Sequence, residues 1–215
     1  LGARGVYALL GATGSGKSSL LGILAGRNRS GSGWMLRGKI FYQGIGLGSA
    51  ARPAVVGPQL GCPDIKLRDY LLGDASLEPA DAYPQLIEQL ERVGLLALGE
   101  HLDQVLGQGE LRLSRGQWWR LALARELLAD PPLLCLDEPT AELDAEEAAL
   151  LLLVLRGIGR TRTVLLATRD EQQARDCGDY LIRLVRGHID QHEPIWRGAA
   201  QEPPNPPVRA SADRS

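Results

Sequence analysis

A glycine-rich stretch near the N-terminus holds the residues best suited to chemistry. It consists of Gly11, Ala12, Thr13, Gly14, Ser15, Gly16, Lys17 and Ser18, and the next residue, Ser19, belongs to the same predicted binding set. Glycines allow consecutive backbone N–H groups to turn inward around phosphate oxygens. In this pattern the lysine adds a positive charge at the β- and γ-phosphates, and the Ser18 hydroxyl is a ligand for Mg²⁺. The stretch therefore predicts a phosphate-binding loop.

The neighbours of this stretch favour the same interpretation. An apolar run over residues 6–10 predicts a strand that ends at the loop, and residues 18–25 predict an apolar helix that follows it. A helix that begins near Lys17 directs its N-terminal N–H groups toward the same anion. The alternative is a glycine-rich turn with an exposed lysine. Such a turn would need neither the strand before it nor the helix after it, so these neighbours favour the phosphate-binding loop.

Two carboxylates follow a second apolar run, over residues 133–136. A strand that is apolar on both faces is typical of the centre of a parallel sheet, and ligands bind at the carboxyl ends of such strands. We expect Asp137 to hold Mg²⁺ through water and Glu138 to act as the general base toward an attacking water. On its own the strand leaves open the alternative of a solvated acidic turn.

Further motifs stand in a fixed order along the chain. Residues 113–117 read Leu-Ser-Arg-Gly-Gln before a predicted helix, residues 136–140 read Leu-Asp-Glu-Pro-Thr, and residues 141–144 read Ala-Glu-Leu-Asp. Together with the phosphate loop, they make the sequence resemble the ATP-binding cassette (ABC) ATPase family over about residues 5–190. The resemblance implies that the chain binds ATP with Mg²⁺ and hydrolyses it.

The resemblance also implies roles for residues outside the loop. Gln59 is similar to the family's glutamine that ligates Mg²⁺ and senses the γ-phosphate. Ser114, Gly116 and Gln117 are similar to residues that contact the ATP held by a second cassette, so that two cassettes enclose two ATP molecules head to tail. A serine at the start of a helix is also an ordinary N-cap, and Ser114 is expected to be one.

Two residues depart from the family pattern. Arg115 stands where a glycine is common, which we expect to be a small change. Arg169 stands where the family usually has a histidine that contacts the γ-phosphate and the attacking water. An arginine still binds phosphate, but it does not titrate near neutral pH. We therefore expect ATP binding to be retained and hydrolysis to be slowed, unless Arg169 points away and pairs with a surface acid.

The alternation of strands and helices predicts an α/β fold, a P-loop NTPase core with a mainly parallel sheet. A helical subdomain is expected at about residues 61–125, within an ABC ATPase domain over residues 1–197. The proline-rich residues 198–215 are expected to be a disordered tail. Because only ten residues precede Gly11, the family's N-terminal antiparallel strands are expected to be missing, and Leu1 suggests a fragment.

The composition of the chain restricts the kinds of partner and the compartment to be expected. Lys and Arg number 24 against 26 Asp and Glu, a net charge of −2, so no general field attracts nucleic acid. No apolar run approaches the roughly 20 residues of a membrane-spanning helix. The three cysteines form no C-x-x-C pair, which favours a reducing compartment.

The family resemblance implies that the chain is an ATP-hydrolysing subunit or domain of an ABC transporter. It implies two partners, a second cassette (identical or different) and transmembrane subunits or domains that hold the chain at the cytoplasmic face of a membrane. Two alternatives remain: a soluble ABC ATPase of DNA repair or translation, and a regulatory cassette that binds ATP but scarcely hydrolyses it. The direction of transport and the transported substrate stay open.

Overall fold

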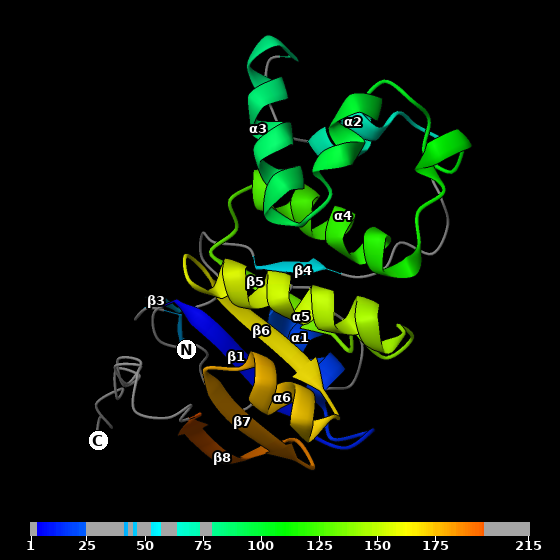
Figure 1. The fold of residues 1–215 in the computed structure, drawn as a ribbon. Helices are drawn as coiled ribbons and strands as arrows, with labels where there is room; N and C mark the ends of the chain where they lie inside the picture. The colour runs from blue at the N-terminus through cyan, green and yellow to red at the C-terminus, as the bar shows by residue number, and fades with distance from the viewer. Residues whose placement is uncertain are drawn as a thin grey trace, which may run out of the picture.

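A six-stranded sheet forms the centre of the molecule (Figure 1). This computed structural model describes residues 4–24, 41–42, 45–46, 53–56, 64–73 and 79–195. The strands, in the order of the sheet, are β4 (Ala54–Val56), β5 (Leu133–Asp137), β6 (Thr163–Thr168), β1 (Gly5–Leu10), β7 (Tyr180–Val185) and β8 (His188–Pro194). Neighbouring strands are parallel except for β7 and β8. The predicted α/β class with a mainly parallel sheet is confirmed.

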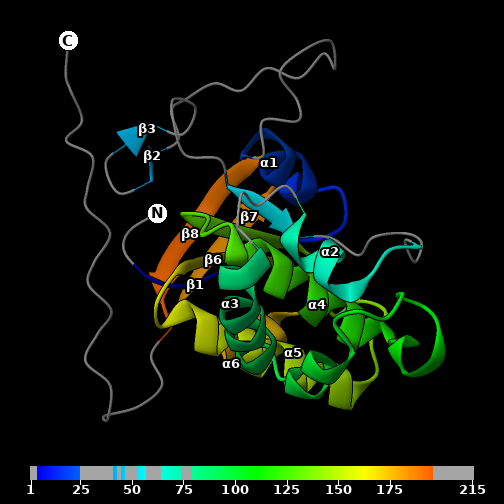
Figure 2. The same ribbon diagram turned by 90° about the horizontal axis from the view of Figure 1, so that it is seen from above.

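Helices cover both faces of this sheet because the buried strands alternate their side chains between two apolar layers. Tyr7 and Leu9 of β1 pack with Leu21 of α1 (Lys17–Leu24) on one face. Val6 packs on the other face, in the core that also contains residues of α5 (Ala145–Gly159). Figure 2 shows α1 on the opposite side of the sheet from α5 and α6 (Glu171–Cys177).

A helical segment lies between β4 and β5 in the chain and above the sheet in Figure 1. It contains α2 (Leu67–Leu72), α3 (Pro79–Arg92), the short 3₁₀ helices η1 (Leu96–His101) and η2 (Gly109–Leu111), and α4 (Arg115–Leu128). None of the helices in the described residues is long and apolar enough to cross a membrane. The domain boundaries at 61–125 and 1–197 stay predictions, and the expected tail at 198–215 lies outside the described residues.

Two arginines of α4 contact α2 and the residues just after α3. Arg120 is 9% exposed and its Nη1 donates to the carbonyl oxygens of Val93, at 3.4 Å, and Gly94, at 3.0 Å, just after α3. Burial lowers the pKa of the Arg120 guanidinium. The Cζ of Arg125 lies 5.2 Å from the centre of the Tyr70 ring in α2, a cation–π distance.

Strand β8 was not predicted from the sequence. It is antiparallel to β7 and joins it through a turn at Arg186 and Gly187. Most of its residues are exposed and polar, because among the strands of the described residues it lies at the edge of the sheet. An edge strand of this composition carries little of the apolar pattern by which a strand is recognised.

Two glycines near the end of α5 provide a matched test of how closely this helix packs on the sheet. A Cβ at Gly159 would lie 2.6 Å from Cγ2 of Val6, whereas one at Gly157 would meet no atom within 4 Å. We expect Gly159→Ala to lower the free energy of unfolding by about 1–3 kcal/mol. Gly157→Ala is expected to raise it by about 0.5–1 kcal/mol. Chemical denaturation measures both changes, and a Gly159→Ala chain as stable as the Gly157→Ala chain would contradict this packing.

Candidate nucleotide-binding site

The loops after β1, β5 and β6 leave the sheet at the same edge, because β6 lies between the other two and all three run parallel. The N–H of Gly11 donates to the carbonyl oxygen of Thr168 at 3.2 Å, and the N–H of Glu138 donates to that of Ala167 at 2.9 Å. The first residue after each strand is thus fixed to β6. This edge, formed by the carboxyl ends of the strands, is where parallel sheets commonly bind ligands.

The glycines of the predicted phosphate loop are required by its backbone. Gly14 and Gly16 have φ angles of +80° and +104°, which side chains rarely allow. A Cβ on Gly11 would lie 2.5 Å from Oγ of Ser15 and 2.6 Å from the carbonyl oxygen of Leu184, so only glycine fits between them. The loop ends at Lys17, where α1 begins. The N–H groups of the loop and those of the N-terminus of α1 are therefore adjacent and can bind the same anion.

Lys17 links the loop to the acidic end of β5. Its Nζ donates to the carbonyl oxygens of Gly11, at 2.6 Å, and Ala12, at 3.3 Å, and lies 3.3 Å from Oε1 of Glu138. The Lys17 side chain is only 6% exposed. The other carboxylate oxygen of Glu138 accepts from the backbone N–H of Arg169 at 3.4 Å. The structure therefore brings together Lys17, Glu138 and the backbone of Arg169, which lie far apart in the sequence.

Glu138 itself has an unusual backbone conformation. Its φ angle is +48°, in the left-handed region that non-glycine residues seldom adopt. This conformation costs on the order of 1–2 kcal/mol and persists where the surrounding structure determines it. Here the N–H of Glu138 bonds to Ala167 and its carbonyl oxygen accepts from Ala141. The carboxylate of this strained residue lies beside Lys17, and strained residues are found preferentially at functional sites.

The donor set beside the loop suits a divalent cation. Asp137 ends β5, and its Oδ1 is buried without a hydrogen-bond partner in the part of the chain that the structure describes. Ser18, in the first turn of α1, is exposed. Carboxylate and hydroxyl oxygens are the ligands that Mg²⁺ prefers. The residues present therefore fit Mg²⁺, while the third predicted ligand, Gln59, lies outside the described residues.

Cys135 lies two residues before these carboxylates but takes no part in their chemistry. It is fully buried in β5, and burial raises the pKa of its thiol to about 12. The thiol is thus protonated at neutral pH and is not a nucleophile. The charged groups at the end of β5 are its two acids.

The predicted contact residues for a second nucleotide lie together at the start of α4. Ser114 is the N-cap: its Oγ accepts from the N–H of Gln117 at 3.2 Å, and its own N–H donates to Oε1 of Gln117 at 2.8 Å. This is a capping box, so the expected N-cap is confirmed. The Ser114 hydroxyl also donates to Oε1 of Glu147, and the N–H of Gly116 donates to Oε2 of Glu147 at 3.3 Å.

Glu147 was not among the residues predicted from the sequence. It lies in α5, 33 residues from Ser114, and no spacing along the chain connects the two. The available signal was its place three residues after Asp144, whose side chain caps α5 by accepting from the N–H of Glu147 at 2.8 Å. That signal predicts a helix start and not a contact with α4.

A glycine loop that leads into a helix, with its lysine against a carboxylate at the end of a parallel strand, defines a P-loop nucleotide-binding protein. A family model described as "ABC transporter" matches residues 1–141. Since this is well over half of the chain, the chain belongs to the ABC transporter family. The predicted family, and the predicted ATP-binding ATPase component of an ABC transporter, are confirmed.

Curated relatives agree with this family. The thiamine import ATP-binding protein ThiQ of Cereibacter sphaeroides is 35% identical over 207 residues, which are 92% of this chain and 84% of the relative. The uncharacterized ABC transporter ATP-binding protein YbbA of Escherichia coli K12 is 32% identical, over 86% of this chain and 82% of the relative. The methionine import ATP-binding protein MetN 2 of Paraburkholderia xenovorans is 28% identical over 91% of this chain. The chain spans 52% of MetN 2.

A solved structure shares the fold. A bacterial Atm1-family ABC exporter with ATP bound superposes with a TM-score of 0.68 over 89% of this chain and 34% of the exporter chain. The sequence identity is 20%, so this likeness supports the fold alone.

Proposed function

We propose that the chain binds Mg-ATP in the loop at residues 11–18 and hydrolyses it with Glu138 as the general base. The observation that carries this proposal is the 3.3 Å contact between Nζ of Lys17 and Oε1 of Glu138. It puts a cation for phosphate and a base for water within one site. The transport that this hydrolysis powers takes place through transmembrane subunits or domains, which hold the chain at the cytoplasmic face of a membrane.

Lys17 changes its partner when nucleotide binds. Without nucleotide, its ammonium group faces Glu138 and two loop carbonyls. The β- and γ-phosphates carry more negative charge than one carboxylate, so they take over the ammonium group on binding. Ser18, Asp137 and Gln59 would hold Mg²⁺, which would supply positive charge to the phosphate oxygens.

This exchange prepares Glu138 for its role. A carboxylate released from an ammonium group accepts a proton from water more readily. The strained backbone and the Arg169 N–H hold it at the carboxyl edge of the sheet while it does so. General-base catalysis of this kind accelerates a reaction by about 10²–10⁴-fold. The Arg169 side chain contacts the γ-phosphate in this proposal, because a guanidinium group binds phosphate through paired hydrogen bonds.

A second cassette completes each site. Ser114, Gly116 and Gln117 at the N-terminus of α4 present donors to the γ-phosphate of the ATP bound by the other cassette. That cassette is a second copy of this chain or a related one. Two of the relatives have import in their names, whereas the solved structure with the same fold is an exporter. These similarities therefore favour neither direction of transport.

A second candidate function is a regulatory cassette that binds ATP with little turnover. The observation that favours it is Arg169, which replaces the family's usual histidine beside the γ-phosphate. This candidate keeps the loop and the Mg²⁺ ligands and differs only in the rate of hydrolysis.

Mixing two defective chains tests whether a copy of the chain supplies the second half of the site. Lys17→Ala disables the phosphate loop, and Gly116→Asp places a carboxylate where the other chain's phosphate must approach. A dimer of one of each contains one intact site only if α4 acts on the partner's nucleotide. We expect each variant alone to lack Mg-ATP hydrolysis and an equal mixture to recover about a quarter of the wild-type rate, if the sites act independently.

The control replaces the Lys17→Ala chain with a chain carrying both substitutions, which offers no intact α4 to its partner. Recovery in the first mixture and none in this one supports the proposal. A wild-type chain that hydrolyses ATP together with a first mixture that recovers nothing contradicts the exchange of sites between copies.

A further inference from the structure

An acidic side chain of the same molecule occupies the predicted phosphate-contacting end of α4. Each carboxylate oxygen of Glu147 accepts one hydrogen bond, Oε1 from the hydroxyl of Ser114 and Oε2 from the N–H of Gly116. A carboxylate held in this way at a helix N-terminus is an anion in an anion-binding site.

The shape of the contact depends on glycine. A Cβ on Gly116 would lie 2.9 Å from Cδ and 3.0 Å from Cβ of Glu147, so any other residue would push the carboxylate away. Asp144 fixes Glu147 from its own side by capping the first turn of α5. The position of Glu147 is therefore determined by both helices.

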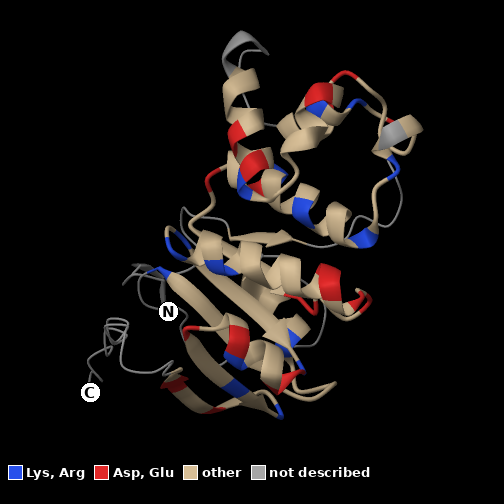
Figure 3. Ribbon diagram, in the orientation of Figure 1, with Lys and Arg blue, Asp and Glu red and all other residues tan. Residues whose placement is uncertain are grey.

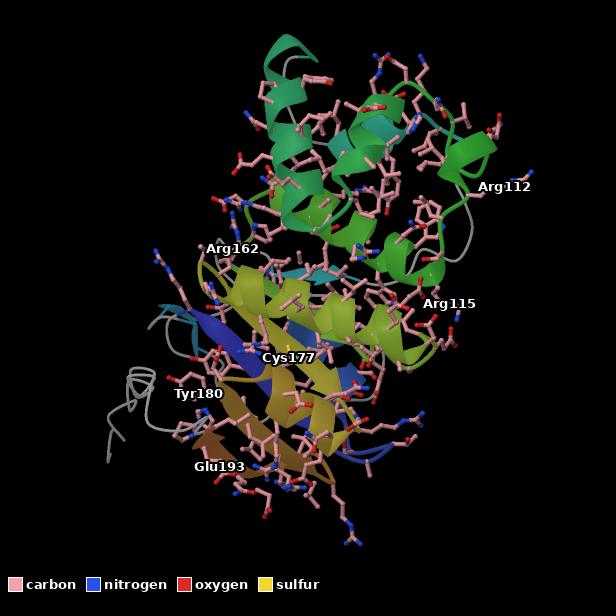
Figure 4. All side chains as sticks on the ribbon, in the orientation of Figure 1. Arg112, Arg115, Arg162, Cys177, Tyr180 and Glu193 are labelled. Atoms are coloured by element: carbon pink, nitrogen blue, oxygen red, sulfur yellow. The ribbon has the colours of Figure 1, made fainter. Side chains whose placement is uncertain are left out.

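A second ion pair joins the same two regions. Arg115, the residue that departs from the family's usual glycine, pairs with Glu142 just before α5. Figure 4 labels Arg115 at the start of α4, beside the N-terminal end of α5. In Figure 3 the ribbon is red, for acidic residues, at that end of α5 and blue, for a basic residue, at the start of α4. The N-terminus of α4 is thus held against α5 by two acids of the same chain.

The donors that hold Glu147 are the ones that the second nucleotide requires. The Ser114 hydroxyl has a single proton, and it donates that proton in the hydrogen bond to Oε1 of Glu147. A carboxylate and a γ-phosphate cannot both occupy this place, because two anions that share one set of donors repel each other. Ser114 is exposed and Glu147 is half-buried, so the exchange does not require unfolding.

We infer that Glu147 is an internal competitor of the γ-phosphate that the partner cassette's ATP presents to Ser114 and Gly116. This inference rests on the proposed function, because it concerns the same donors. In the free chain Glu147 keeps the end of α4 occupied. Closure of two cassettes around ATP requires Glu147 to leave, so the contact lowers the affinity of one cassette for the other without a direct contact to the nucleotide in its own loop.

Removal of the competitor should strengthen ATP-dependent dimerisation. The experiment uses the full 215-residue chain with Glu138→Gln, which allows bound ATP to persist, and measures the dimer dissociation constant by sedimentation with Mg-ATP and with Mg-ADP. We expect Glu147→Ala to lower this constant about tenfold with Mg-ATP, equivalent to about 1.4 kcal/mol. Glu147→Gln, which keeps the size but not the charge, should lie between it and the parent. The control is Glu146→Ala, which removes the exposed acid next to it in the same turn.

Measuring Mg-ATP binding to the monomer distinguishes a failure of the proposed function from a failure of the competition by Glu147. All variants should bind nucleotide with the affinity of the parent, since Glu147 does not contact the loop. A parent chain that binds no Mg-ATP overturns the proposed function. A chain that binds Mg-ATP, but whose Glu147→Ala variant dimerises no more readily than Glu146→Ala, overturns the competition by Glu147 and leaves the proposed function intact.

Discussion

Replacing Lys17 with alanine is expected to weaken Mg-ATP binding by about 2–4 kcal/mol, or about 30- to 1000-fold in Kd. The ammonium group is buried, and it directs its N–H groups at two loop carbonyls and one carboxylate. Alanine removes the positive charge that, in the proposed site, contacts the β- and γ-phosphates. Isothermal titration calorimetry with Mg-ATP measures the change.

Lys66 provides the matched control. It is a lysine of the helical segment, its side chain is 43% exposed, and it pairs with Asp103. We expect Lys66→Ala to leave the Kd unchanged within about twofold, since exposed ion pairs contribute little. Thermal unfolding of both variants checks that they fold. A folded Lys17→Ala chain with the affinity of the Lys66→Ala chain would exclude the loop as the nucleotide site.

Replacing Glu138 with glutamine is expected to lower kcat for ATP hydrolysis by about 10²–10⁴-fold while Mg-ATP still binds. Glutamine keeps the size of the side chain and a carbonyl oxygen for the N–H of Arg169, but it has no basic oxygen for the proton of water. Binding should become tighter, since Lys17 loses a competing carboxylate. A coupled assay of released phosphate gives kcat, and calorimetry gives the Kd.

Glu100→Gln is the control for this substitution, because Glu100 is an exposed acid of η1 in the helical segment. It should hydrolyse ATP at the wild-type rate. The same assay separates the two candidate functions. If wild-type and Glu138→Gln chains both bind Mg-ATP and hydrolyse it equally slowly, the chain is a regulatory cassette, and Glu138 is not its base.

The site around Lys17 and Glu138 could be predicted because its chemistry is local. Each half is a short pattern: glycines and a lysine after one strand, and two acids after another. The rule that parallel strands present their carboxyl ends at one edge then brings the halves together. The structure adds what no pattern contains, the left-handed backbone of Glu138 and the bond from the N–H of Arg169.

The contacts of α4 could not be predicted, because they depend on how helices pack. Ser114 and Glu147 are separated by the whole of α4 and β5, and their meeting requires the helical segment to lie over the N-terminal end of α5 (Figure 1). Sequence spacing determines neighbours within a helix but not between two helices. The same holds for Arg120, which looks like an ordinary polar residue of a helix until its two carbonyl acceptors after α3 are placed beside it.

Two arginines of α4, Arg120 and Arg125, link movement of its first turn to α2 and to the residues after α3. Arg120 binds the chain just after α3, and Arg125 lies over the ring of Tyr70 in α2. Because the hydrogen bonds of Arg120 are buried, bending between these helices would leave charged donors without acceptors at a high cost in free energy. We therefore expect a shift at the start of α4 to move α2 and the end of α3 together with it, because both are joined to α4 by these arginines.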